Sequence, residues 1–239
     1  MEKLKSGAEK LSLQLSENQL GLFQTYYEEL IDWNQRMNLT AITEYDKVQI
    51  NHFLDSLTVV CAWTPAANGP HPRVIDVGTG AGVPGIPLKI VFPDMRLTLL
   101  DSTNKKTVFL NHLKQKLKLE DIDIVTGRAE EIAHRNQYRE QFDLVLARGI
   151  AAMATLTELT LPFCKIGGKM IAHKKGDINE EMNQSKKAID VLGGKLIDIK
   201  PVEISEFPDR RCLVVIEKVA ATPPQYPRRS GMPVKNPLI

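Results

Sequence analysis

The residue types around one glycine-rich turn are suited to holding a nucleoside. The run Asp76-Val-Gly-Thr-Gly-Ala-Gly82 places an acid two residues before three alternating glycines. Glycine adopts positive φ and lets a ligand approach the backbone closely, so Gly78 and Gly80 can pack against a nucleoside. Asp101 lies 19 residues beyond Gly82 and can accept two hydrogen bonds from a ribose diol. These residues together predict a nucleoside cofactor.

Two kinds of cofactor fit this turn. The segment Gly80-Ala-Gly-Val-Pro-Gly85 matches the Gly-x-Gly-x-x-Gly pattern of an NAD-dependent dehydrogenase, which stays an alternative. S-adenosylmethionine is favoured because Asp76 can reach the amino end of a methionine moiety, and because Pro84 has no N–H to offer a pyrophosphate. No Gly-Lys-Ser/Thr follows the glycines, which excludes a Walker-type phosphate loop. A purely structural turn also stays open.

Two later segments extend this site. Ala129 and Glu130 follow a short apolar run, where Ala129 can pack on an adenine ring and Glu130 can accept from its exocyclic amine. Glu130 fits equally well as an acid at the positive end of a helix. Arg148 ends the next apolar run, at the position that faces the transferred methyl group. An arginine there can stack on guanine or hydrogen-bond it, or it can form a surface ion pair.

The residues around Arg148 narrow the chemistry. Methyltransferases acting on exocyclic amines commonly carry Asn/Asp-Pro-Pro-aromatic here, whereas this chain has Leu146-Ala-Arg-Gly-Ile150. Pyrimidine C5 chemistry needs a cysteine nucleophile, and Cys164, in a Phe-Cys-Lys context, is predicted to be a packing thiol. The pattern favours an acceptor atom that is already nucleophilic, such as guanine N7.

Alternating strand and helix patterns must position these residues. From Arg73 onward, apolar runs alternate with helical periodicity, and the last two runs, 195–204 and 212–219, leave no room for a helix between them. This order predicts an α/β, Rossmann-like class I methyltransferase fold, with a doubly wound, mostly parallel sheet and one antiparallel strand. We divide the chain into an N-terminal helical extension (1–72), an S-adenosylmethionine-binding core (73–219) and a basic, Pro-rich C-terminal tail (220–239).

Local signals define the extension and its boundary. Ser16-Glu-Asn-Gln19 has the pattern of a capping box, and helical periodicity follows it. A second helix is predicted to start near Asp46, which places His52 and Asp55 where they can face the cleft or form a polar pair on the helix surface. The prolines and glycine of 64–72 predict a loop.

Composition sets broad limits. The chain has 239 residues, a net charge of +2, 43% hydrophobic and 25% charged residues, which is ordinary for one globular α/β domain with an extension. Three scattered cysteines predict reduced thiols and no metal site. The start lacks a secretory apolar region, and no apolar run is long enough to span a bilayer. We therefore expect a cytoplasmic monomer without a membrane partner.

Basic residues near the predicted ligand edge suggest an RNA partner. Lys174-Lys175 ends a predicted strand, Arg210-Arg211 opens another, and the tail has three basic residues and no acid. They can line a phosphate path, although a disordered tail is the alternative. The predicted RNA-binding residues are Lys174, Lys175, Arg228, Arg229 and Lys235.

The chain resembles the small-subunit ribosomal RNA guanine-N7 methyltransferases, the RsmG or glucose-inhibited division protein B family. The resembling segments cover nearly the whole chain, and the tail 227–238 is the most specific of them. The other segments are Trp33-Asn34, 38–42, 52–57, 76–88, Asp101-Ser102, 127–130 and 146–148. The resemblance implies methylation of N7 of one guanine, position 527 in the 530 loop of 16S rRNA, with S-adenosylmethionine as cofactor and 16S rRNA or the 30S subunit as partner.

Carried over residue by residue, the resemblance implies cofactor contacts at Gly78, Val83, Ala129, Glu130 and Arg148. From its position at the end of the fourth apolar run, we also predict Arg148 as the catalytic residue. Val83 stands where the family usually has phenylalanine, which reduces apolar cover over the cofactor; Thr79 replaces a common serine, and Gly149 an alanine. A methyltransferase of a small molecule or another RNA, and an RNA-binding module without catalysis, stay alternatives. The cofactor-binding residues are Asp76, Gly78, Thr79, Gly80, Gly82, Val83, Asp101, Ser102, Ala129, Glu130 and Arg148.

Overall fold

A seven-stranded sheet forms from the apolar runs of the core, in the order β3-β2-β1-β4-β5-β7-β6. The computed structural model describes residues 1–65 and 69–239. The strands are β1 (Arg73–Val77), β2 (Arg96–Asp101), β3 (Ile122–Thr126), β4 (Phe142–Arg148), β5 (Cys164–Lys175), β6 (Gly194–Val202) and β7 (Arg211–Lys218).

Strand direction confirms the predicted α/β class. The neighbours β3, β2, β1, β4 and β5 pair in parallel, whereas β7 runs antiparallel to both β5 and β6. The chain moves outward from β1 to β3 and then returns to β4 on the other side of β1. Ligands of such sheets bind at the carboxyl ends of the strands beside this reversal, so the ends of β1 and β4 position the site.

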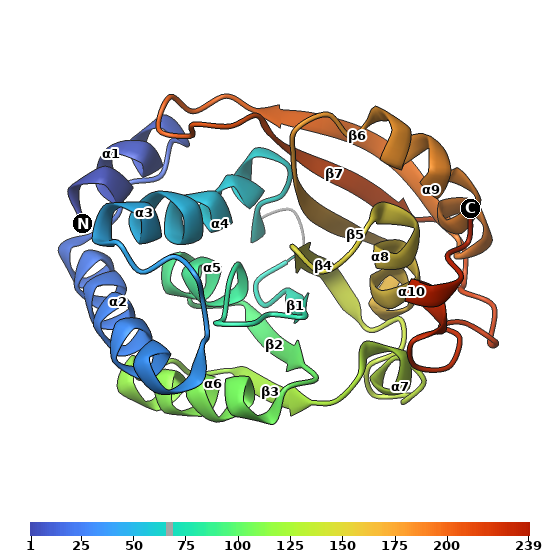
Figure 1. Ribbon diagram of the computed structural model, residues 1–239, viewed down its shortest axis with the longest axis horizontal. Coiled ribbons are helices and arrows are strands. Elements are labelled where there is room, and N and C mark those ends of the chain that lie inside the picture. The colour runs from blue at the N-terminus through green and yellow to red at the C-terminus, as the bar shows by residue number, and fades with distance from the viewer. Residues whose placement is uncertain (66–68) are drawn as a thin grey trace.

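Two apolar clusters cover the two faces of the sheet. Successive strand residues point to opposite faces, so Val74 packs with one cluster and Ile75 with the other. In Figure 1, helices α1–α6 lie to the left of the sheet and α7–α10 to its right. The helices on the two sides include α1 (Glu2–Lys10), α2 (Glu17–Met37), α5 (Gly85–Val91), α6 (Asn104–Lys116), the short α7 (Ala129–Ile132), α8 (Met153–Thr160) and α9 (Asn179–Val191).

The extension is helical, as its periodicity indicates. The predicted capping box is present at α2, with Ser16 and Gln19 exchanging side-chain and backbone hydrogen bonds. The second predicted helix is one helical run made of α3 (Tyr45–Val48), a π-helical turn (Gln49–Leu54), α4 (Asp55–Leu57) and a 3-10 turn (Thr58–Cys61). Residues 66–68 of the predicted loop 64–72 lie outside the described residues.

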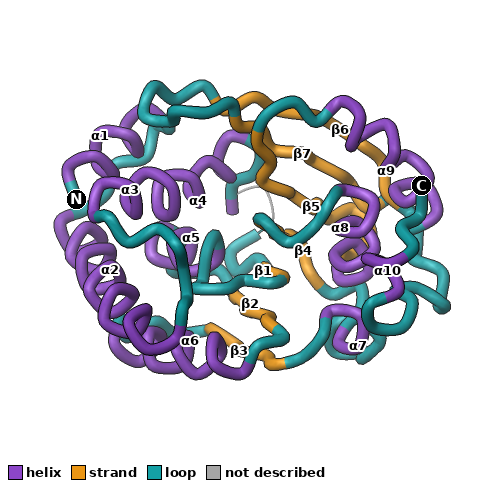
Figure 2. The backbone as a smooth tube through the Cα atoms, viewed as in Figure 1, coloured by secondary structure: helices purple, strands orange, loops and turns teal. Residues whose placement is uncertain are grey.

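The C-terminal tail packs against the core. It is mostly loop, with one short helix, α10 (Met232–Lys235), beside α7 and α8 (Figure 2). Pro227 and Pro233 are buried, and Thr155 on α8 donates a hydrogen bond of 2.9 Å to the Pro233 carbonyl. The tail is therefore docked on the core, and the alternative of a disordered tail is wrong.

Candidate active site

Asp76 organises the glycine turn at the end of β1. Its Oδ2 accepts hydrogen bonds from the Thr79 hydroxyl (2.7 Å) and the Gly85 N–H (2.9 Å). Its Oδ1 is buried and has no hydrogen-bond partner among the described residues. Burial raises the pKa of this carboxyl to about 7. Asp76 therefore holds the turn with one oxygen and keeps the other for a group not supplied by the protein.

The start of α5 argues against a dinucleotide. Pro84 precedes the helix and has no N–H, and the Gly85 N–H already donates to Asp76. A pyrophosphate at a helix start needs free N–H donors, and here the first two positions offer none. The structure therefore disfavours the dehydrogenase alternative.

A cavity of about 90 Å³, the glycine-turn cavity, gathers residues from the ends of four strands. Asp101 lies at its edge, where its carboxylate accepts from the backbone N–H groups of Gly80 (3.0 Å) and Thr103 (2.9 Å). The Ile150 side chain packs directly on the backbone of Gly78, which has φ +67° and no room for a Cβ. Five predicted cofactor residues line this cavity: Gly78, Asp101, Ser102, Ala129 and Glu130.

Three other predicted cofactor residues lie behind the turn. Thr79 is 1% exposed and is committed to Asp76. Gly82, with φ +98°, faces Ile86, Leu110 and the Tyr26 hydroxyl, and Val83 packs against the apolar core. These three residues therefore hold the glycine turn against the protein interior and do not line the glycine-turn cavity.

Arg148 ends β4 and is held by the extension. Its Nη1 lies 2.8 Å from Oδ2 of Asp55 as an ion pair rather than a directed hydrogen bond, and its Nη2 lies 2.9 Å from Nδ1 of His52. Burial raises the pKa of Asp55, but the cations of Arg148 and Arg211 outweigh that effect and hold the pKa below its usual value. Asp55 is therefore the fixed anion of this cluster.

His52 is a neutral acceptor in this cluster. Arginine only donates, so Nδ1 of His52 accepts from Arg148, and Nε2 carries the proton and donates to the Thr40 hydroxyl at 2.8 Å. Burial, followed by the Arg148 charge, lowers the pKa of His52 to about 4. The sequence-based alternative of a surface polar pair is wrong, because His52 and Asp55 are both buried.

Two residues of this site were missed from sequence. Arg211, expected on a phosphate path, has a side chain only 2% exposed and donates to Asp55 at 2.6 Å and to Asn51 at 2.5 Å. Tyr26, on α2, donates its hydroxyl to the Ala81 carbonyl of the glycine turn at 2.5 Å. Both link residues far apart in the chain, and no local pattern indicates such pairs.

A second cavity, the Arg148 cavity, has a volume of about 370 Å³. Its lining is adjacent in sequence to that of the glycine-turn cavity, because Arg148 and Gly149 line the one and Ile150 the other. Arg148 thus lines a cavity large enough for a base, and Ile150, two residues further along the chain, lines the cavity that holds the predicted cofactor residues. Its lining residues are Asp55, Arg148, Gly149, His173, Lys174 and Lys175.

The predicted RNA-binding residues fall into two groups. Lys174 donates to Glu181 at 2.5 Å, and Arg228 forms a two-point ion pair with buried Glu158. Lys175 pairs with Asp209 at an exposed position, and the side chains of Arg229 and Lys235 have no hydrogen-bond or ion-pair partner within residues 1–65 and 69–239. Of these five residues, only Lys175, Arg229 and Lys235 are exposed to solvent.

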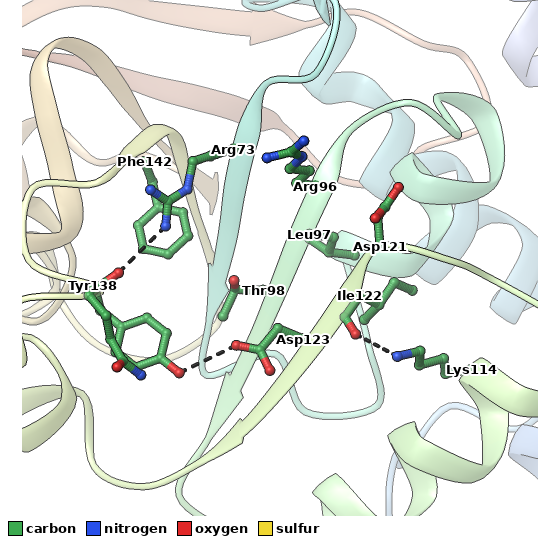
Figure 3. A pocket seen from close by; sticks show the side chains of 11 residues that line it. Arg73, Arg96, Leu97, Thr98, Lys114, Asp121, Ile122, Asp123, Tyr138 and Phe142 are labelled. Atoms are coloured by element: carbon green, nitrogen blue, oxygen red, sulfur yellow. Dashed lines mark hydrogen bonds between the residues drawn. The ribbon is translucent and has the colours of Figure 1, made fainter.

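A further cavity, of about 530 Å³, lies at the opposite edge of the sheet, where β1–β4 begin. Figure 3 shows its side chains bonded to the protein itself: Tyr138 donates to Asp123 at 3.3 Å, and Lys114 donates to the Ile122 carbonyl at 2.7 Å. Arg73 also lies over the Phe142 ring, 5.2 Å from its centroid. This cavity is remote from the strand ends that carry the glycine turn.

The described residues contain no cluster of three or more His, Cys, Asp or Glu side chains suited to a metal ion. In the same part of the chain, no helix has the length and apolar character needed to cross a membrane. Cys164 is buried, and burial raises the pKa of its thiol to about 12. A thiol with so high a pKa is a poor nucleophile, which agrees with its prediction as a packing residue.

Comparison with known proteins decides the family. The family model described as GidB, rRNA small subunit methyltransferase G, matches residues 19–210. Ribosomal RNA small subunit methyltransferase G of Dehalococcoides mccartyi (strain BAV1) is 49% identical over 239 residues, the whole of both chains. That of Alkaliphilus metalliredigens (strain QYMF) is 45% identical over 235 residues, 98% of this chain and 97% of the relative. This chain belongs to the rRNA small subunit methyltransferase G family.

Family membership makes the chain a methyltransferase, and its methyl donor is S-adenosylmethionine, as the sequence predicts. A solved structure agrees on the fold. TYW2 of M. jannaschii in complex with AdoMet matches with a TM-score of 0.50 at 16% identity, over 63% of this chain and 71% of that chain. The unpartnered oxygen of Asp76 and the residues of the glycine-turn cavity fit this cofactor.

Proposed function

We propose that this chain transfers a methyl group from S-adenosylmethionine to N7 of a guanine in the 530 loop of 16S rRNA, at position 527. The observation that carries the proposal is the place of Arg148, which ends β4, lines the Arg148 cavity and precedes by two residues Ile150 of the glycine-turn cavity. Its donors suit the O6 acceptor of guanine, and its partners Asp55 and His52 fix its direction.

The cofactor supplies an electrophilic methyl group on a positively charged sulfur. The protein's part is to align this group with the acceptor. We assign the ammonium group to the free oxygen of Asp76, the ribose to Asp101, and the adenine to Ala129 and Glu130. Ile150 has to move off Gly78 on binding, because about 90 Å³ is on the order of three water volumes. Gly149, with φ +66° and open space around it, allows that movement.

Guanine N7 is the acceptor that these side chains serve best. Its lone pair is free, so methyl transfer to N7 needs no general base. Nδ1 of His52 already accepts from Arg148, and Asp55 is paired with two arginines, so neither residue is available as a base. The target base enters the Arg148 cavity by leaving its RNA stack. Exposed Lys175, Arg229 and Lys235 contact the phosphates, so binding weakens with added salt.

The test incubates the protein with methyl-labelled S-adenosylmethionine and small ribosomal subunits from cells that lack the gene. We expect label in N7-methylguanosine at one position of the 530 loop. Arg148→Ala should abolish the signal, whereas Arg36→Ala, which removes an exposed arginine paired with Asp32 on α2, should keep it. Label in another nucleoside, or in another loop, would refute the proposal. Free 16S rRNA and the whole subunit, used side by side, identify the substrate form.

A further inference from the structure

The C-terminal tail, residues 220–239, returns from β7 across α7 and α8 (Figure 1). Arg139 donates to three carbonyls at the beginning of the tail, those of Thr222 (2.9 Å), Pro223 (3.2 Å) and Tyr226 (2.9 Å). His134, just beyond α7, lies within 2.8 Å of the Pro227 carbonyl. These bonds fix the path of the tail before it reaches the glycine-turn cavity.

A buried ion pair fastens the tail to α8. Glu158 is 0% exposed and accepts from Arg228 at Nε (2.9 Å) and Nη2 (2.7 Å), and also from the Arg228 backbone N–H (2.8 Å). Arg228 in turn donates to the Asn236 carbonyl at 2.8 Å, which closes the tail on itself around α10. A carboxylate buried this deeply is strongly destabilised without its cationic partner. Detaching the tail from α8 therefore has a high free-energy cost.

The tail also binds the residue predicted to meet adenine. The Gly231 N–H donates to Oε1 of Glu130 at 2.9 Å, and the Ser230 hydroxyl donates to Glu131 at 3.0 Å. Gly231 has φ +83°, a conformation that glycine adopts easily and that turns this N–H toward Glu130. Glu130 is 6% exposed and lines the glycine-turn cavity.

One contact of the tail reaches a residue that lines the glycine-turn cavity, and the other reaches the neighbour of such a residue. Glu130 lies on one wall, and Leu159, the neighbour of Glu158 on α8, lies on another. We infer that the tail is a positioning element of the cofactor pocket: Arg228 fixes α8, and the Gly231 N–H holds one oxygen of Glu130, so that the other oxygen is presented to the adenine amine. Arg228 is thus a positioning residue, which leaves the phosphate contacts to Arg229 and Lys235. This inference rests on the proposed function in assigning adenine to Glu130.

The first test measures the affinity of the full-length protein for S-adenosylhomocysteine by calorimetry. We expect Arg228→Ala to weaken binding at least tenfold, and Arg228→Lys, which keeps the charge but loses the two-point geometry, to fall in between. Arg229→Ala changes the adjacent arginine, whose side chain holds nothing in the described residues, and should bind S-adenosylhomocysteine within twofold of the unmodified protein. Wild-type affinity in Arg228→Ala would overturn the inference.

Steady-state kinetics separate positioning from loss of folded protein. Arg228→Ala should raise the KM for S-adenosylmethionine about as much as it weakens binding, with kcat retained once the cofactor saturates. A fall in kcat with an unchanged KM would mean that the arginine only maintains the fold, and would also overturn the inference. Arg229→Ala should instead raise the KM for RNA and leave both the KM for S-adenosylmethionine and the affinity for S-adenosylhomocysteine unchanged.

A second test needs no substitution. If the tail positions Glu130, cofactor binding must stabilise the tail by the same linkage. We expect S-adenosylhomocysteine to slow hydrogen exchange at the Gly231 amide, as it does at the Gly80 amide of the turn. Protection at Gly80 without any at Gly231 would overturn this inference and leave the proposed function standing. If the unmodified chain bound no S-adenosylhomocysteine, both the cofactor assignment of the proposed function and this inference would fall.

Discussion

Two buried carboxylates attach the two ends of the chain to the core by the same chemistry. Asp55 belongs to the extension and binds two arginines of the core, Arg148 and Arg211, whereas Glu158 belongs to the core and binds Arg228 of the tail. The surroundings differ: Asp55 lines the Arg148 cavity, and Glu158 is fully enclosed. A buried ion pair is therefore no measure of function by itself. Its position relative to the cavities decides whether it serves the acceptor side or the cofactor side.

Removing Asp55 should have the largest effect, because two buried guanidinium groups would then face each other without an anion. We expect Asp55→Ala to lower the free energy of unfolding by about 3–5 kcal/mol and to abolish methyl transfer. Asp46→Ala, on the same helical run, removes an exposed partner of Lys3 and should cost about 0–1 kcal/mol. Urea unfolding measures both. An Asp55→Ala protein as stable as Asp46→Ala would show that the cluster is not the anchor of the extension.

Acid should loosen the Asp55 end selectively. The pKa of His52 is about 4 in the folded protein, because of burial and then Arg148, against 6.5 for the free side chain. The unfolded chain thus binds more protons between these values, and stability falls as the pH drops from 6.5 toward 4. At pH 5 the loss from His52 is about 2 kcal/mol. His173, whose pKa burial also lowers, adds to the same trend.

The control for this prediction is His52→Gln, which cannot titrate. Its unfolding free energy should depend less on pH between 7 and 5 than that of the unmodified protein, by about the same 2 kcal/mol. Equal pH dependence in the two proteins would mean that His52 is not held neutral. The Glu158 end contains no histidine in contact with the ion pair within the described residues, so it should not contribute.

Cofactor affinity should respond to pH through Asp76. Burial raises its pKa to about 7, so the free protein loses the carboxylate form as the pH falls below 7. The cofactor's ammonium favours the ionised form. Affinity for S-adenosylhomocysteine should therefore increase about tenfold from pH 6 to pH 8, and Asp76→Asn should bind weakly at both. Calorimetry in two buffers of different ionisation enthalpy should also detect the released proton, and its absence would count against the assignment.

The smallest effect is expected at the second contact of the extension. Tyr26→Phe removes the hydrogen bond to the Ala81 carbonyl and should cost about 1 kcal/mol, with severalfold weaker cofactor binding because the glycine turn loses its support. Tyr27→Phe is the matched control, since its hydroxyl donates to the Thr43 carbonyl at an exposed position. Equal cofactor affinity in the two variants would mean that the extension acts on the site only by holding Arg148, and not by supporting the glycine turn.

Local patterns predicted the fold well, and long-range pairs were the part that sequence could not supply. The predicted runs 195–204 and 212–219 are observed as the antiparallel strands β6 and β7 with bounds within two residues, because apolar runs and flanking turns are properties of neighbouring residues. The glycine turn was recognised because its conformational needs fix its residue types. Arg228 gave the opposite case: its charge indicated an anion, but nothing local tells whether that anion is a phosphate or Glu158, 70 residues away. Helix α1, with one short apolar stripe, was likewise not predicted on its own.

The pair formed by Glu158 and Arg228 has a consequence for biosynthesis. When residue 158 has been translated, its partner is still 70 codons from the peptidyl-transferase centre, and α8 must wait with an unmatched carboxylate. Only when residues 228–231 have also been made and have left the ribosome can the tail dock and Glu130 receive the Gly231 N–H. A nascent chain that has not yet released this segment is therefore an incomplete enzyme.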